Sequence, residues 1–201
     1  MHEIAHFIVQ SIGDIGYFGI FFLMFLESSF FPFPSEIVMI PAGYLAFTGE
    51  MNIYLAFLAG VLGSLVGALF NYFLAIKYGR AFLIKYGDKF FFKETTLDKL
   101  EDFFKKHGEI STFNGRLIPG VRQYISFPAG LSQMNITKFS IYTSLGASIW
   151  MIVLLAIGYI IGDNQALVES YLKNATIIAI TTVSFLSILY YLKVKKCCLF
   201  N

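Results

Sequence analysis

The chain has 201 residues, of which 57% are hydrophobic, 18% aromatic and only 14% charged, with a formal net charge of +2. This composition, with a mean hydropathy of +0.68, excludes an ordinary soluble domain and predicts a single polytopic membrane domain over residues 1–201. The sequence contains no catalytic triad, P-loop or dinucleotide-binding motif, so we expect neither an enzyme nor a cofactor. We also expect no metal site and no nucleic-acid partner.

The first half of the chain divides into three blocks. Residues 15–48 are apolar but are interrupted by three prolines and two glutamates. Residues 53–76 are uninterrupted, and since about 20 helical residues cross a bilayer, they are predicted to be a transmembrane helix. Residues 77–107 are polar with apolar side chains at helical spacing, which predicts an amphipathic surface helix.

The second half follows a similar order. Residues 110–135 are moderately apolar and are broken by two prolines. Residues 139–161 then form a second predicted span, and residues 176–192 form a third.

Two short sequences occur in both halves. Pro-Ala-Gly begins at Pro41 and at Pro128, and Met-Asn-Ile follows at Met51 and at Met134. Glycines lie at the same two offsets after each Met-Asn-Ile: Gly63 and Gly79 in the first half, Gly146 and Gly162 in the second. The matched spacing predicts a duplicated unit, with repeats at 15–76 and 108–162.

The basic residues predict how the chain is oriented. Eight of the 15 lie between Lys77 and Lys106, and none precedes Lys77. The positive-inside rule therefore places residues 77–107 and the C-terminus in the cytoplasm. A re-entrant first block then places the N-terminus outside.

In this orientation both ends of residues 110–135 are cytoplasmic, so the block must enter and leave the membrane on one side. By the duplication, residues 15–48 should enter from the outer side; a kinked span there, with the N-terminus inside, is the alternative. The expected fold is all-α: an inverted repeat of two opposed re-entrant hairpins, each followed by a transmembrane helix, plus a C-terminal span.

The two predicted hairpins carry opposite charges. Glu27 and Glu36 lie in the first, and Arg116 and Arg122 in the second. The predicted tips, where proline ends a helix, are Pro32, Pro34, Pro119 and Gly120. If both tips reach the middle of the membrane, acids and arginines meet there. Buried ion pairs stabilise weakly compared with apolar packing, so we favour a functional role over a purely structural lock.

The arginines and the glutamates have different expected roles. The arginines suit bidentate binding of a phosphate, and the glutamates suit proton coupling or gating. Ser35 precedes Glu36 and is a candidate helix cap. Asn71 shares a face with small residues and, with its neighbour Tyr72, is a candidate for lining the site; the small residues themselves predict close helix packing.

These residues resemble a known family. The run Glu27…Pro32-Phe33-Pro34-Ser35-Glu36, the Pro-Ala-Gly that follows, and the arginine motif from Phe113 to Arg122 are similar to the DedA family, part of the SNARE-associated or VTT-domain superfamily. The resemblance covers about residues 15–162. It implies opposed re-entrant hairpins, a bacterial inner-membrane location, and lipid translocation linked to the proton-motive force. It also implies that the two glutamates and two arginines are essential.

The sequence and the resemblance together predict a flippase or scramblase for a phosphate-bearing lipid, with undecaprenyl phosphate as the favoured cargo and protons as a hypothetical coupling ion. Alternatives are a phospholipid flippase or scramblase, a proton-coupled transporter of small cations or drugs, and a non-transporting scaffold. The expected partners are membrane lipids, and a homo-oligomer is compatible with the sequence.

Overall fold

The computed structural model describes residues 2–29, 34–80, 94–118 and 120–162. This part of the chain is helical and contains no strand. The predicted span 176–192 and the predicted tip residues Pro32 and Pro119 lie outside it. The helices are α1 (His2–Ser28), α2 (Glu36–Phe47), α3 (Ile53–Leu74) with a π-helical turn (Ala75–Gly79), α5 (Glu94–Leu117), α6 (Ser126–Leu131) and α7 (Ile136–Ile161).

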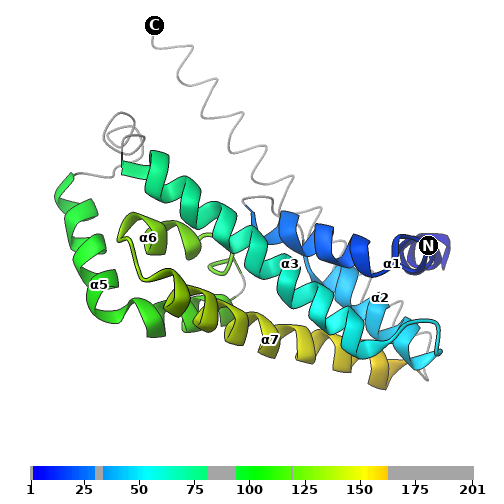
Figure 1. Cartoon of the computed structure of the whole chain (residues 1–201). Helices are drawn as coiled ribbons and strands as arrows, with labels where there is room; N and C mark the ends of the chain where they lie inside the picture. Colours follow the sequence, from blue (N-terminus) through cyan, green and yellow to red (C-terminus); the bar gives the residue numbers. More distant parts are fainter. Residues whose placement is uncertain (1, 30–33, 81–93, 119, 163–201) are drawn as a thin grey trace, which may run out of the picture.

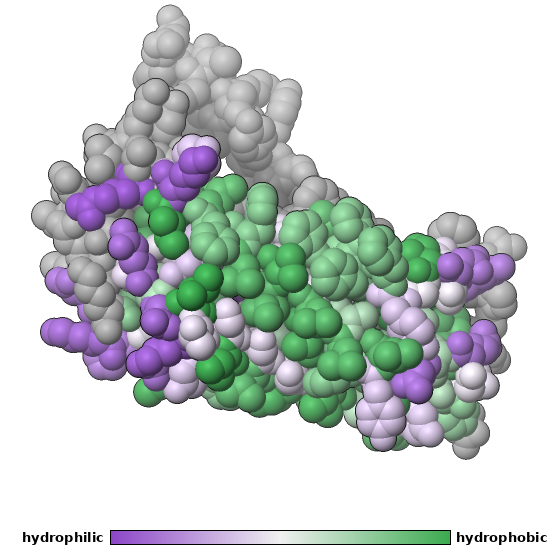
Figure 2. All heavy atoms as spheres, viewed as in Figure 1, coloured by the Kyte–Doolittle hydropathy of each residue, from purple (hydrophilic) through white to green (hydrophobic). Residues whose placement is uncertain are grey.

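Two long antiparallel helices, α3 and α7, run the length of the molecule (Figure 1). They match the two internal spans expected from the sequence. By length and composition, three described segments can cross a membrane: Val9–Ser28, Ile53–Gly79 and Ile136–Ile161. Figure 2 shows hydrophobic residues over the middle of the visible face and hydrophilic residues at its two ends, as expected for a helical membrane protein.

The first apolar block consists of two short helices. α1 is broken at Gly16, whose φ of 62° is left-handed backbone that favours glycine. The part after the break, residues 17–28, has 12 residues, as does α2. In Figure 1, α2 runs back against the direction of α1. Each segment is about 18 Å long at 1.5 Å per residue.

The second block differs from the first in detail. α5 is a single helix of 24 residues that runs across the expected boundary between the surface segment 77–107 and the repeat 108–162. A turn that includes Gly120, with φ 83°, leads to α6, which has only six residues. Pro-Ala-Gly and Met-Asn-Ile begin six residues apart in this half, against ten in the first, so α6 ends sooner after its Pro-Ala-Gly than α2 does.

The asparagine of each Met-Asn-Ile caps the long helix that follows it. Asn52 Oδ1 accepts hydrogen bonds from the amides of Tyr54 and Leu55 at the start of α3. Asn135 Oδ1 accepts in the same way from Thr137 and Lys138 at the start of α7. An N-cap asparagine satisfies backbone donors that the helix leaves open, so the tripeptide sets where each long helix begins.

Candidate functional site

Arg122 lies between the two glutamates of the first block. Its Nη2 atom is 2.5 Å from Glu27 Oε1, in an ion pair without hydrogen-bond geometry. The same Nη2 atom is 3.8 Å from Glu36 Oε1. The Glu27 side chain is 3% exposed and that of Glu36 is 26% exposed. One arginine therefore faces a fully buried carboxylate at the end of α1 and a more accessible one in the first turn of α2.

Arg116, in the last turn of α5, is held differently. Its Nη1 donates to Ser28 Oγ at 3.3 Å and its Nη2 donates to Ser126 Oγ at 3.2 Å. Ser28 ends α1 and Ser126 begins α6. The Arg116 fork thus joins the two blocks, and among the described residues it makes no ion pair with a carboxylate.

Several buried polar atoms at this site lack a partner. Nε of Arg116 and Nε of Arg122 have no hydrogen-bond acceptor among the described residues. Such a donor costs about 1–3 kcal/mol when buried without a partner. The site therefore presents cationic donors suited to an anion with several acceptor oxygens.

The candidate lining residues Asn71 and Tyr72 have different surroundings. Asn71 is fully buried, and its Nδ2 donates to the carbonyls of Ser28 at 2.9 Å and Gln123 at 3.5 Å, so it contacts the segments that carry Glu27 and Arg122. The hydroxyl of Tyr72 donates instead to the carbonyl of Met134. Its ring stacks on Phe139, so Tyr72 packs beside the start of α7.

Ser35 does not act as the side-chain cap expected from the sequence. It occupies the N-cap position of α2, but its hydroxyl makes no cap hydrogen bond. Ser35 Oγ instead accepts a hydrogen bond from Trp150 Nε1 at 3.2 Å. The Trp150 ring centroid is also 5.2 Å from the guanidinium carbon of Arg122. Sequence reasoning missed this role for Trp150, although it is the only tryptophan in the chain.

The described tip residues shape the backbone near these charges. The carbonyl of Pro34 accepts from the amide of Ile37 at 3.2 Å and so leads into α2. Gly120 supplies the left-handed conformation between α5 and α6.

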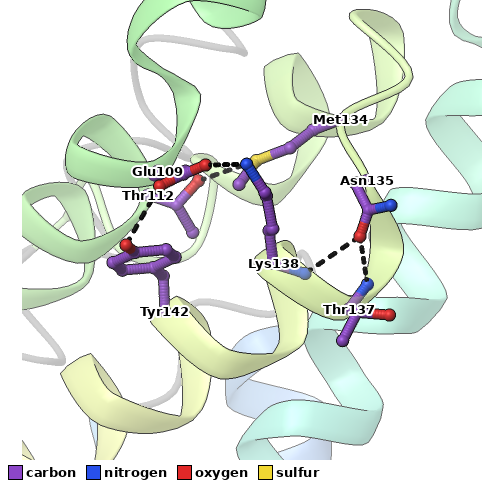
Figure 3. A network of polar contacts seen from close by, with 7 residues as sticks. All are labelled: Glu109, Thr112, Met134, Asn135, Thr137, Lys138 and Tyr142. Atoms are coloured by element: carbon purple, nitrogen blue, oxygen red, sulfur yellow. Dashed lines mark hydrogen bonds and ion pairs between the residues drawn. The ribbon is translucent and has the colours of Figure 1, made fainter.

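A second polar cluster joins α5 to α7 (Figure 3). Glu109 Oε1 is 2.5 Å from Lys138 Nζ, and Glu109 Oε2 accepts a hydrogen bond from the Tyr142 hydroxyl at 3.0 Å. The hydrogen bond from Lys138 holds the pKa of Glu109 below its ordinary value. Both charged side chains are more than a third exposed, and exposed pairs contribute little stability. We therefore regard this cluster as a surface contact.

The fold and the buried charges define a helical membrane protein with an ionisable site between its two halves. A family model described as the VTT domain matches residues 33–160, a range that contains Glu36 and both arginines. The chain is 32% identical over 198 residues to undecaprenyl phosphate transporter A of Bacillus subtilis, covering 96% of each protein. It is 29% identical over 184 residues to Protein DedA of Escherichia coli K12, covering 89% of this chain and 83% of that protein.

The chain therefore belongs to the VTT-domain, or DedA, family. Another relative, from Lactococcus lactis MG1363, is called alkaline phosphatase-like protein; it is 34% identical over 194 residues, covering 92% of this chain and 91% of that protein. No solved structure matches the chain.

Proposed function

We propose that this chain is a transporter in the bacterial inner membrane that moves a phosphate-bearing lipid, undecaprenyl phosphate in the first instance, between the two leaflets. The observation that carries the proposal is the buried arginine pair with unpartnered Nε donors beside two carboxylates. The name of the Bacillus subtilis relative supports the choice of cargo.

The proposed architecture is an inverted repeat of two re-entrant hairpins. In each half the first helix packs on its own span: α1 at Gly63 and Gly67 of α3, and α5 at Gly146 of α7. The second helix packs on the span of the other half: Gly43 of α2 meets α7, and Gly130 of α6 meets α3. These matched crossings support the repeat. In the first block, re-entrance is supported by the break at Gly16, because residues 17–28 and α2 are each about 18 Å long and do not cross a hydrocarbon core of about 30 Å.

In the proposed mechanism the phosphate replaces Glu27 as the partner of Arg122 and also engages Arg116. Two planar guanidinium groups match the oxygens of a phosphate through paired hydrogen bonds. A carboxylate left without a partner in the membrane is costly, so the released Glu27 takes up a proton. Glu36, the more exposed acid, exchanges protons with water and passes them to the site.

Flux of undecaprenyl phosphate across vesicles that contain the purified protein tests this function. We expect faster movement between leaflets than in protein-free vesicles, and a further acceleration by a pH gradient. Flux of phosphatidylglycerol alone would favour a phospholipid scramblase, and flux of a small cation alone would favour a cation transporter. Release of inorganic phosphate from the same vesicles would favour an enzyme, as the name of the Lactococcus lactis relative suggests.

The proposed orientation makes a separate prediction. In a background without Cys197 and Cys198, a cysteine at Gln10 should react with an impermeant thiol reagent added to intact cells, because the N-terminus lies outside. A cysteine at Lys106 should be protected until the cells are opened. Both positions are exposed. Protection at Gln10 together with labelling at Lys106 would reverse the orientation.

A further inference from the structure

Trp150, in the middle of α7, contacts both halves of the proposed site. The centre of its ring lies 5.2 Å from the guanidinium carbon of Arg122. Its Nε1–H donates to Ser35 Oγ at 3.2 Å, and Ser35 is fully buried just before Glu36. A single side chain therefore connects an arginine of the second block with the start of α2 in the first.

The contact between Trp150 and Arg122 determines which guanidinium atoms are left to bind a ligand. Its Nη2 faces both glutamates, while its Nε has no partner among the described residues. An aromatic face beside a guanidinium attracts the cation and leaves its edge available for hydrogen bonds in the plane of the group. The indole thus holds Arg122 while its buried Nε–H keeps no acceptor among the described residues and could donate to a phosphate.

The same face of α7 also contacts Arg116. Gly146 lies four residues before Trp150, which places the two on one side of the helix. A Cβ atom at Gly146 would lie only 2.6 Å from Arg116 Cβ, so the base of the Arg116 side chain packs directly on α7. α7 therefore contacts Arg116 at a glycine, which has no side chain to separate them, and contacts Arg122 through the large side chain of Trp150.

We propose that Trp150 is a positioning residue for phosphate binding: it holds Arg122 in its binding orientation, and its hydrogen bond to Ser35 ties that orientation to the first block. This inference rests on the proposed function, because it assigns a role within the same site.

Variants of the two partners test the inference in the vesicle assay, with undecaprenyl phosphate as the probe. Trp150→Phe keeps an aromatic face but loses the donor, and Ser35→Ala loses the acceptor. Each should raise the half-saturating lipid concentration about fivefold while changing maximal flux much less. The double variant should be no worse than either single one, because both remove the same bond. Trp150→Leu, which also removes the aromatic face, should raise the half-saturating lipid concentration about fivefold further.

Ile149→Leu is the matched control, because Ile149 is the exposed neighbour of Trp150. It should behave as the wild type. Unchanged half-saturation in all Trp150 and Ser35 variants, or a loss confined to maximal flux, would overturn the positioning role. Additive effects in the double variant would also overturn it. Absence of flux in the wild type would overturn the proposed function and this inference with it.

Fluorescence gives a readout that does not depend on transport, because Trp150 is the only tryptophan. Ser35→Ala and Arg122→Lys should each shift the emission of the purified protein, and Ile149→Leu should not. An unchanged spectrum in both of the first two variants would overturn the contacts on which the inference depends, even if wild-type flux is normal.

Discussion

Glu27→Gln is expected to fold but to lose the dependence of lipid flux on the pH gradient. Glutamine nearly keeps the size of the side chain and mimics a carboxyl that is always protonated. Arg122 would retain one acid in reach, because Glu36 Oε1 lies 3.8 Å from the same Nη2 atom. Flux measured with and without an imposed gradient, together with thermal unfolding of the same sample, checks both parts of the expectation.

The double variant Glu27→Gln, Glu36→Gln is the informative comparison. It removes both carboxylates from a buried guanidinium, and an unpaired buried charge costs about 3–5 kcal/mol. We expect poor expression or a much lower unfolding temperature. If the double variant is as stable as the wild type, the ion pairs do not hold the site together. If Glu27→Gln keeps full gradient dependence, protons do not act through Glu27.

Arg116→Lys should reduce lipid flux by more than tenfold even though the charge is kept. In the structure, the two ends of the guanidinium reach two serines on different blocks, at 3.3 and 3.2 Å. A single ammonium group does not reproduce that fork, and hydrogen bonds from charged groups are each worth about 1.5–3 kcal/mol. Flux at saturating lipid and the apparent lipid affinity should both fall.

Lys138→Arg provides the control for this change. It exchanges the same two residue types at the exposed pair with Glu109, where a contribution of about 0–1 kcal/mol is expected. Flux should stay near the wild-type rate. Normal flux in Arg116→Lys would mean that only diffuse positive charge is needed, and specific phosphate binding by Arg116 would be wrong.

The long helices and the helical membrane class could be predicted because both depend on local sequence. An uninterrupted apolar run is sufficient to predict α3 and α7, and the repeated Met-Asn-Ile marks where each begins through its asparagine cap. The opposite charges on the two proline-broken blocks pointed to the residues that the structure brings near one another, with Arg122 between Glu27 and Glu36.

The detailed pairing could not be predicted, because it depends on tertiary packing. Nothing in the sequence distinguishes Arg122, which pairs with acids, from Arg116, which pairs with serines. Ser35 had the local signature of a cap, but its hydroxyl faces Trp150, 115 residues further along the chain. The continuity of α5 was also missed, since a change from polar to apolar composition does not itself end a helix.

Mass spectrometry of the lipids that co-purify with the protein tests whether this site binds the phosphate of a lipid. The wild type should retain one phosphate-bearing lipid in excess over the bulk phospholipid, and the double variant Arg116→Lys, Arg122→Lys should lose that enrichment while keeping its bulk phospholipid. Undecaprenyl phosphate would be the expected species, present in the wild type and depleted in the variant. Equal enrichment of the same lipid in both proteins, or enrichment only of a lipid without phosphate, would show that these arginines do not bind a lipid phosphate.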